Sequence, residues 1–419
     1  MNFGGCVIGC AALVGAMWIV SFRSAEEVHR LRDVEVAHDA PVAVVATESG
    51  LVLTLDLAGG AVRARTRLGV EVDAIGLDHT GGQVAVVTAG GDVIVFDPLD
   101  GATRRLCRTA LQARTSDRGH SGDLTVEFDP SGERILVAAL GRGMTLLRSS
   151  GEILWRWPGP TDGPWGENDS RYGTRLSWDH EHDRIALATE TGFEVIDAGS
   201  GEVITVERVP GEPPVPLRFA SPADIFSVVF DGKRNTVYAG HCDCRLRAYD
   251  LSTGETAVLH TYARPMMDLP DDPYGQPPEP ADEPRIYLWT QFAKLSLSPD
   301  GARLGYSTTE NVNVGIFDLE SRSCTASFET YSGSMGVPGR IAWSDDSKRL
   351  FFTSPDSTAI RFVLPTSEPA MPREPEPTKA IEPPRFYGGK GVAISAQRVF
   401  GVDAKTGRST WSRSIKNLR

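Results

Sequence analysis

A pattern of four short apolar runs separated by turns repeats along this chain. In residues 295–328, apolar residues alternate with polar or small ones within each run, and Ser298–Gly301 (SPDG) stands between the first two runs. An alternation with a period of two predicts β-strands, and Pro, Asp and Gly are typical of the tight turns that join antiparallel strands. The stretch therefore predicts a four-stranded antiparallel sheet, whose strands we call a, b, c and d in chain order.

The same pattern recurs over most of the chain. Because each unit holds about 40 residues and has its own turns, the repeats predict an array of similar sheets rather than one continuous sheet. Four-strand units are found at 73–106, 123–157, 174–205, 226–259 and 295–328, and three-strand units at 43–65, 338–364 and 391–413. The residues that close strand c are Asp56, Asp97, Arg148, Asp197, Asp250 and Asp318.

These units resemble the blades of WD-repeat β-propellers. Residues 119–132 (GHSGDLTVEFDPSG) are similar to the Gly-His opening, first strand and turn of such a blade. Residues 399–411 (VFGVDAKTGRSTW) also resemble the repeats of quinoprotein-type propellers. The chain departs from the WD pattern because Gly-His opens only one unit and no unit ends strand c with Trp-Asp. The pairs that stand there instead include Phe96-Asp97, Tyr249-Asp250 and Phe317-Asp318.

The resemblance implies an all-β fold, a β-propeller of seven or eight four-stranded antiparallel blades, with eight favoured. Propeller rings usually close by joining strands from both ends of the chain, which removes open sheet edges. The expected domains are an N-terminal partial blade, the main blades, a Pro-rich linker or insertion, and a C-terminal partial blade that closes the ring. They are placed at 1–40, 41–364, 365–390 and 391–419.

The first residues allow two interpretations. Asn2–Phe22 carries no charge, and 3–22 could just span a bilayer as a membrane segment. Arg23, Arg30 and Arg32 would then keep the propeller in the cytoplasm. Residues 12–32 also align with the b, c and d runs of 44–65, and this alignment favours strands of a partial blade.

Composition narrows the range of partners. The 419 residues are 41% hydrophobic and carry a net charge of −12. An acidic chain is a poor match for the phosphates of nucleic acid, so we expect no nucleic-acid partner. The six cysteines do not form the dense framework of a small secreted protein, which favours a reducing compartment. We therefore expect a cytoplasmic monomer, or a membrane-anchored chain if 3–22 spans a bilayer.

The long insertions fall almost entirely between strand d of one unit and strand a of the next. They are 108–122, 159–173, 209–223, 263–292 and 365–390. In a WD-like blade these connections share one face of the ring, so that face is the expected binding surface. The loops carry aromatic residues and, in 263–291, an excess of acids, which suit a protein or peptide partner that is basic. The candidate partner-binding residues are Trp165, Tyr172, Tyr274, Tyr287 and Trp289.

The sequence offers little evidence for metal or catalytic chemistry. His241, Cys242 and Cys244 are a weak candidate metal or redox group, because no second cluster supplies further ligands for zinc. By alignment this stretch is a b–c turn, and His180-Glu181-His182 fills an a–b turn. We therefore assign no catalytic residue, no metal and no cofactor.

Two classes of function remain. The first is a non-enzymatic scaffold that binds a protein or peptide on the face with the long d–a loops. The alternative is a propeller enzyme, lactonase-like or another hydrolase, with its site at the mouth of the ring. A cluster of inward-facing Asp, Glu, Asn and His residues at one mouth would favour the enzyme.

Overall fold

The computed structural model describes most of the repeats and omits most of the long connections between them. The described residues are 31–111, 124–139, 143–158, 176–189, 192–208, 225–241, 245–261, 292–308, 313–329, 341–353, 360–363, 385–395 and 398–415.

Every described strand belongs to one of eight antiparallel sheets, and each sheet is built from one continuous stretch of chain. Seven sheets have four strands and the seventh in chain order has three. The first four sheets are β1 (Leu31–Val36), β2 (Val42–Thr47), β3 (Leu51–Asp56), β4 (Val62–Arg67); β5 (Val72–Leu77), β6 (Val84–Thr88), β7 (Asp92–Phe96), β8 (Thr103–Arg108); β9 (Leu124–Phe128), β10 (Arg134–Ala139), β11 (Gly143–Arg148), β12 (Ile153–Trp157); and β13 (Leu176–Asp179), β14 (Arg184–Thr189), β15 (Gly192–Asp197), β16 (Val203–Arg208).

The remaining four sheets follow the same order. They are β17 (Ile225–Asp231), β18 (Thr236–His241), β19 (Arg245–Asp250), β20 (Thr256–Thr261); β21 (Phe292–Leu297), β22 (Arg303–Thr308), β23 (Asn313–Asp318), β24 (Ser323–Glu329); β25 (Ile341–Trp343), β26 (Leu350–Thr353), β27 (Ile360–Val363); and β28 (Arg385–Tyr387), β29 (Lys390–Ile394), β30 (Arg398–Asp403), β31 (Ser409–Ser414).

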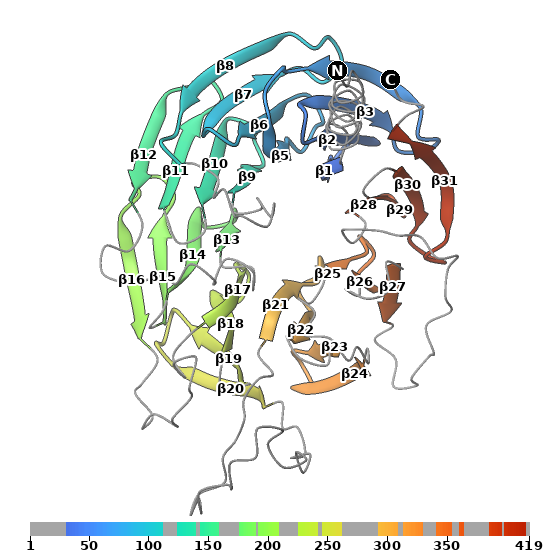
Figure 1. Cartoon of the computed structure of the whole chain (residues 1–419). Helices are drawn as coiled ribbons and strands as arrows, with labels where there is room; N and C mark the ends of the chain where they lie inside the picture. Colours follow the sequence, from blue (N-terminus) through green and yellow to red (C-terminus); the bar gives the residue numbers. More distant parts are fainter. Residues whose placement is uncertain are drawn as a thin grey trace, which may run out of the picture.

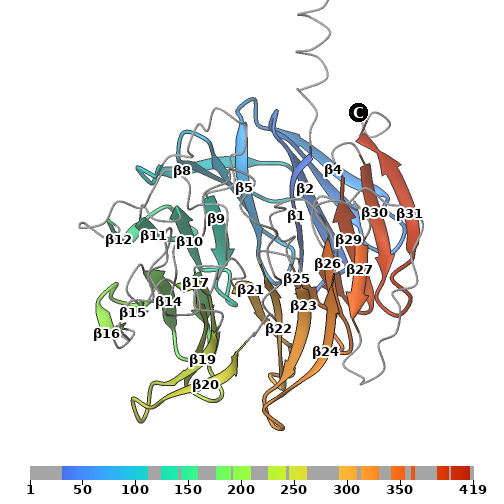
Figure 2. The same cartoon turned by 60° about the horizontal axis from the view of Figure 1, so that its bottom comes forward.

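The sheets stand around a common axis, with the first strand of each on the inside and the last on the rim (Figures 1 and 2). Among the described residues, eight buried hydrophobic clusters form the core, one between each pair of neighbouring sheets. Because these clusters lie on both sides of each sheet, the middle strands are apolar in sequence, as β2 shows. All six residues of β2 (VAVVAT) are buried, because neighbouring sheets cover both faces of that strand.

Side chains from the preceding sheet bind the inner edge of the ring. Asp33 accepts a hydrogen bond from the Ile75 N–H at 3.1 Å, and Ser227 Oγ accepts one from the Leu295 N–H at 2.9 Å. These contacts satisfy backbone donors that have no strand partner, which protects an otherwise open sheet edge.

The ring closes between two complete sheets. We expected a blade shared by both ends of the chain, but β1–β4 and β28–β31 each have four strands from their own stretch. Val45 of the first sheet packs in one cluster with Val392 of the last. On the rim, the Trp411 Nε1–H donates to the Leu57 carbonyl at 3.4 Å.

The strand assignment of residues 31–32 also differs from the expected one. Leu31 and Arg32 lie in β1, the first strand of its sheet, whereas the alignment of 12–32 placed them in the last strand of a preceding unit. Residues 12–20, which we expected to form strands, lie outside the described residues. No helix in the described part of the chain is long and apolar enough to cross a membrane.

The predicted all-β propeller of antiparallel blades is confirmed. The number of blades in the complete ring, the domain boundaries and the monomeric state stay predictions.

Candidate functional site

The two ends of the ring are formed by different kinds of connection between strands. Within each sheet the strands run alternately up and down, so the a–b and c–d turns share one end, which we call the turn face. The b–c turns share the other end with the connections from each rim strand to the next inner strand, and we call this end the loop face. The long connections 112–123, 159–175, 209–224 and 262–291 therefore start and finish on the loop face.

The five candidate partner-binding residues all belong to these long connections. Trp165 and Tyr172 lie between β12 and β13, and Tyr274, Tyr287 and Trp289 lie between β20 and β21. All five are outside the described residues, so their role on the loop face stays a prediction.

Two described segments show how connections begin on the loop face. Leu68 N–H donates to the Gly50 carbonyl at 2.9 Å, and Thr109 N–H donates to the Gly91 carbonyl at the same distance. Gly50 and Gly91 have positive φ angles of 83° and 81°. A Cβ on Gly91 would lie 1.8 Å from the Leu111 carbonyl oxygen, so a glycine is needed where the connection packs on the b–c turn.

His241 is a buried residue of β18, not part of a turn. The sequence alignment placed it in a b–c turn, but β18 runs to His241 and its side chain is fully buried. Its Nε2 lies 3.0 Å from the Tyr249 hydroxyl. Burial, together with the charges of Arg247 and Arg245, lowers the His241 pKa well below 6.5. Cys242 and Cys244 lie outside the described residues, and the described part of the chain has no group of three or more candidate metal ligands.

We expect His241 to make the fold sensitive to acid. Because its folded pKa is depressed, the unfolded chain binds a proton below about pH 6.5 that the folded chain does not. Stability should therefore be unaffected by this group above that pH and fall as the pH drops below it, by at most about 1.4 kcal/mol per pH unit. Chemical unfolding from pH 7.5 to 5 measures this slope. His241→Gln should flatten it, whereas Tyr249→Phe, which keeps the imidazole buried, should not. An unchanged slope in His241→Gln would contradict the assignment.

A second group of titratable side chains lies on the inner part of the turn face. His38 and His79 stack with their ring centroids 4.5 Å apart, and His79 meets the edge of His180 at 6.3 Å. His180 Nε2 lies 3.0 Å from Glu127 Oε1. Burial and the neighbouring His79 lower the pKa of His38. The four residues come from the first four sheets, so the ring assembles the cluster from distant parts of the sequence.

The sequence carries a signal for this cluster that no local pattern makes readable. His79 and His180 each follow the buried Asp that begins an a–b turn, and His38 follows Ala37 at the same position. The three histidines stand at the same position of three units. This shared position indicates that they lie close together only once the units are known to surround a common axis. The His180–Glu127 pair has the form of an imidazole oriented by a carboxylate, and the other ring nitrogen of His180, Nδ1, is buried without a hydrogen-bond partner among the described residues.

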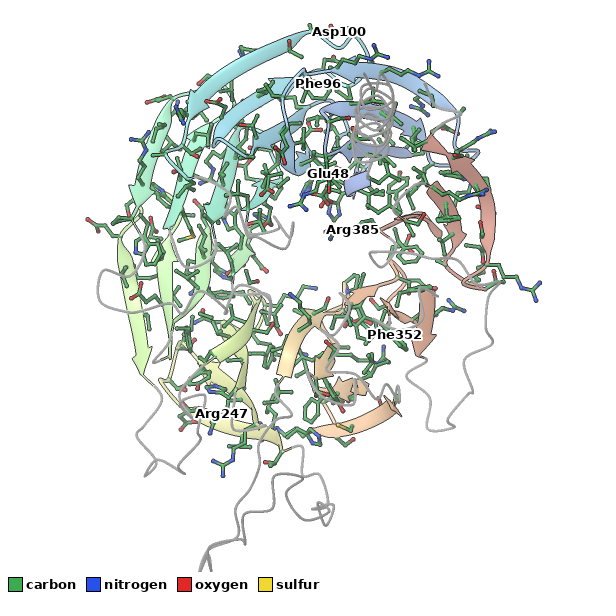
Figure 3. The ribbon with its side chains drawn as sticks, viewed as in Figure 1. Glu48, Phe96, Asp100, Arg247, Phe352 and Arg385 are labelled. Carbon is green, nitrogen blue, oxygen red and sulfur yellow. The ribbon has the colours of Figure 1, made fainter. Side chains whose placement is uncertain are left out.

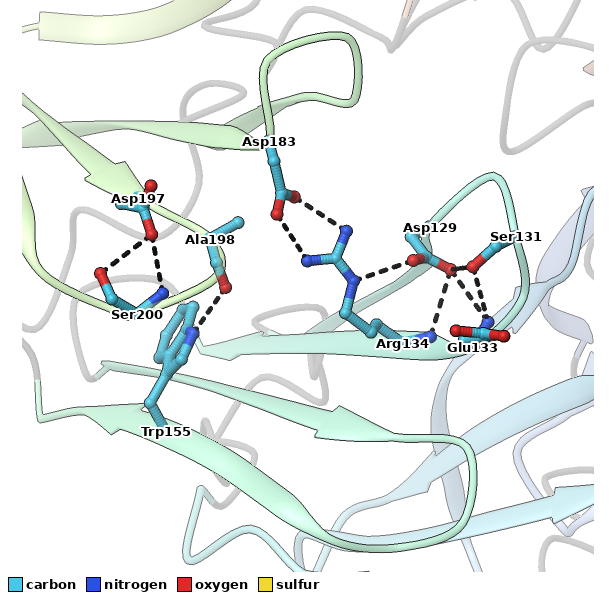
Figure 4. A network of polar contacts seen from close by, with 9 residues as sticks. All are labelled: Asp129, Ser131, Glu133, Arg134, Trp155, Asp183, Asp197, Ala198 and Ser200. Carbon is cyan, nitrogen blue, oxygen red and sulfur yellow. Dashed lines mark hydrogen bonds and ion pairs between the residues drawn. The ribbon is translucent and has the colours of Figure 1, made fainter.

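The buried aspartates of the turn face have structural roles. Asp129 Oδ1 accepts hydrogen bonds from the backbone N–H groups of Glu133 and Arg134 at 3.0 and 3.1 Å. The Arg134 guanidinium donates to Asp129 and, with two further N–H groups, to both oxygens of Asp183 in the next sheet at 2.7 and 2.8 Å (Figure 4). Trp155 Nε1–H also crosses this boundary to the Ala198 carbonyl at 2.7 Å. Asp129 thus stabilises its own turn and, through Arg134, links its sheet to the next one. This is the structural role that its position in the repeat predicts.

An ion pair also joins the first and last sheets on the inner side of the ring. Arg385 Nη2 lies 3.1 Å from Glu35 Oε1, and Figure 3 places Arg385 beside the first and last sheets. The charge of Arg385 contributes to the lowered pKa of His38. The last sheet thus influences the histidine cluster as well as closing the ring.

Comparison with known proteins supports the fold from an independent direction. Residues 15–273 match a family model described as outer membrane protein assembly factor BamB. The chain is similar to a computationally designed protein, Ika8, at 14% identity and a TM-score of 0.57, with 88% of this chain and 94% of that one covered. It is similar to BamB from Moraxella catarrhalis at 12% identity and a TM-score of 0.54, with 89% and 94% covered. No curated protein sequence matches. The predicted resemblance to β-propeller repeats, including a quinoprotein-like one, is confirmed.

Proposed function

The chain belongs to the family of outer membrane protein assembly factor BamB, and from this premise we propose that it is a non-enzymatic scaffold that binds a protein or peptide partner. The observation that carries the proposal is the family match, which covers most of the chain and whose name describes an assembly factor. A rigid ring with loops on one face is suited to holding a partner protein.

The partner surface that we propose is the loop face. Its support is the chain order, because the connections 112–123, 159–175, 209–224 and 262–291 each leave a rim strand and return to an inner strand at that end. The turns at the other end are short and are occupied by structural aspartates. Gly91 fixes the beginning of the long connection 112–123 by close backbone packing, so this loop leaves a rigid base.

We propose that the partner has a basic patch. Residues 263–291 contain Asp268, Asp271, Asp272, Glu279, Asp282 and Glu283 but only two arginines. Tyr274, Tyr287 and Trp289 stand in the same segment and are of the kind that anchors protein interfaces. Acidic residues around aromatic anchors would speed association with a basic protein and make it depend on salt. The expected cytoplasmic location stays a prediction.

Alanine at Trp289 tests this proposal. Proteins captured by the full chain are first identified, and affinity for the captured partner is then measured. Loss of one buried anchor should weaken binding by about 2 kcal/mol, roughly thirtyfold, with little change in melting temperature. Leu99→Ala is the matched control, because Leu99 is 62% exposed on the turn face. It should leave binding unchanged.

Two outcomes would contradict the proposal. A lower melting temperature with unchanged binding would mean that Trp289 packs on its own sheet. Hydrolysis of an ester or lactone that is lost in His180→Gln would favour the enzyme alternative, for which the cluster of His38, His79, Glu127 and His180 is the supporting observation.

A further inference from the structure

The rim of the ring is unexpectedly basic over four neighbouring sheets. The chain as a whole has 55 acidic and 43 basic residues, yet the rim strands β4, β8, β12 and β31 contain no Asp or Glu. The sheets of β4, β8 and β12 follow one another in the ring, and β31 lies on the other side of the closure beside β4 (Figures 1 and 2). The arginines of these strands are Arg63, Arg65, Arg67, Arg104, Arg105, Arg108, Arg156 and Arg413.

One arginine per strand lies near the loop face, and we call these four the arginine arc: Arg67, Arg108, Arg156 and Arg413. All four side chains are exposed. Their positions follow from strand register, because their partners in the neighbouring strands are among the first residues after the b–c turns. Those partners are Leu51, Asp92, Thr145 and Val399.

Within the described residues, the four arginines of the arc take part in few contacts. The Arg156 guanidinium donates to the Arg108 carbonyl at 3.3 Å, which draws the two rim strands together. Asp92, opposite Arg108 in register, is the carboxylate beside the arc. The four arginines are spread over four sheets and share no pocket. Such a row fits an extended anionic surface better than a small anion.

The turn face carries aspartates at the c–d turns of several sheets. Most c–d turns begin with an aspartate, and hydrogen bonds favour the ionised form of two of these carboxylates, Asp197 and Asp56. The N–H of Ser200 lowers the pKa of Asp197, and the Arg63 guanidinium lowers that of Asp56. Lys405 and Arg408 also lie on the turn face, so its charge is mixed, whereas the arc is a row of arginines. An anionic plane would therefore be attracted to the arc.

The N-terminal sequence points to a membrane as that plane. Asn2–Phe22 is uncharged, and only residues 23–30 separate it from β1. Eight residues span at most about 28 Å. Leu31 pairs with Thr47, next to the 48–50 turn, so β1 begins on the loop face. If the apolar segment enters a bilayer, the arginine arc lies at the same end of the ring as that bilayer.

We propose that the arginine arc docks the propeller on a membrane surface that carries anionic headgroups. The arc lies on the rim of the same loop face as the partner-binding connections, but membrane docking does not depend on partner binding. Each arginine close to an anionic bilayer strengthens binding by about three- to fivefold, so four should act together by about 100-fold or more. The effect should weaken as salt screens the charges.

Vesicle binding by the full chain tests the proposal. The probes are vesicles of phosphatidylcholine alone and of phosphatidylcholine mixed with phosphatidylglycerol, and the readout is the ratio of the two affinities, which cancels any insertion of residues 3–22. Changing the four arc arginines to glutamine should reduce this ratio by about 100-fold and leave binding to neutral vesicles unchanged. The matched control changes four exposed basic residues of the turn face to glutamine: Lys233, Lys348, Lys405 and Arg408. It alters net charge equally and should change the ratio by less than about fivefold.

Three results would overturn the proposal. The first is an unmodified chain that binds both kinds of vesicle equally well. The second is an equal loss in the arc variant and the control variant, which would reflect net charge alone. The third is unchanged vesicle binding by an arc variant that no longer captures an acidic protein, since the arc would then be a protein interface. Melting temperatures of both variants confirm that they are folded.

Discussion

Replacing Gly60 with alanine is expected to destabilise the ring by about 3 kcal/mol. Gly60 has a φ of 66°, where a side chain is strained, and an added Cβ would lie 2.4 Å from the Trp411 ring. Trp411 comes from the last sheet and Gly60 from the first, so the clash falls at the ring closure. The loss is measured as the change in free energy of unfolding by denaturant.

Alanine substitutions at two other glycines separate the cost of backbone strain from the cost of the clash with Trp411. Gly254 has a φ of 72° but nothing within 4 Å of its Cβ position, so Gly254→Ala should cost only about 1 kcal/mol for backbone strain. Gly59 has no neighbour and no positive φ, so Gly59→Ala should be nearly neutral. If Gly60→Ala costs no more than Gly254→Ala, then Trp411 does not hold the closure as described.

The repeated pattern of apolar runs and turns predicted the sheets, because such a pattern depends only on residues that are close in sequence. The alternation of apolar residues and the turn residues between them are properties of neighbouring positions, and each sheet is formed by one continuous stretch. The contact between Trp411 and Leu57 joins residues 354 positions apart, and no local pattern predicts such a pair. The motif around Trp411 was recognised as quinoprotein-like, but its partner could only be found from the closed ring.

The first strand was missed for a physical reason. Strand β1 (LRDVEV) contains three charged residues, so it lacks the apolar alternation that identifies a strand. Each charge serves the inner edge of the ring. Arg32 pairs with Asp73, Asp33 accepts from Ile75 N–H, and Glu35 meets Arg385. An inner strand has its partners in neighbouring sheets, and the hydrophobic pattern cannot indicate them.

The candidate site was only partly predictable. The loop face followed from where the insertions fall, because strand order alone decides at which end each connection leaves. The aromatic residues chosen on that face lie outside the described residues. The histidine cluster and the arginine arc depend on which units become neighbours and on strand register, so residue type and spacing did not reveal them.

Arg134 is the second position where a large loss is expected. It joins Asp129 of its own sheet to Asp183 of the next, and the Asp129 side chain is only 6% exposed. Removing the guanidinium in Arg134→Met leaves a buried carboxylate without its cation and should cost about 3 kcal/mol at pH 7. Arg134→Lys keeps the charge but cannot bind both oxygens of Asp183, so an intermediate loss is expected. Denaturant unfolding measures each loss.

The pH dependence distinguishes the ion pair from simple packing. Burial alone would raise the pKa of Asp129, but hydrogen bonds from Arg134 outweigh it and hold that pKa below 3.8. A carboxyl with a depressed pKa stabilises the fold above its ordinary pKa, and this stability is lost as the pH falls through the folded value. The difference between the native chain and Arg134→Met should therefore be greatest near neutral pH and shrink below about pH 4. A difference that stays constant down to that pH would show that Arg134 acts through its contact with the Trp178 ring, 5.5 Å away, rather than through Asp129.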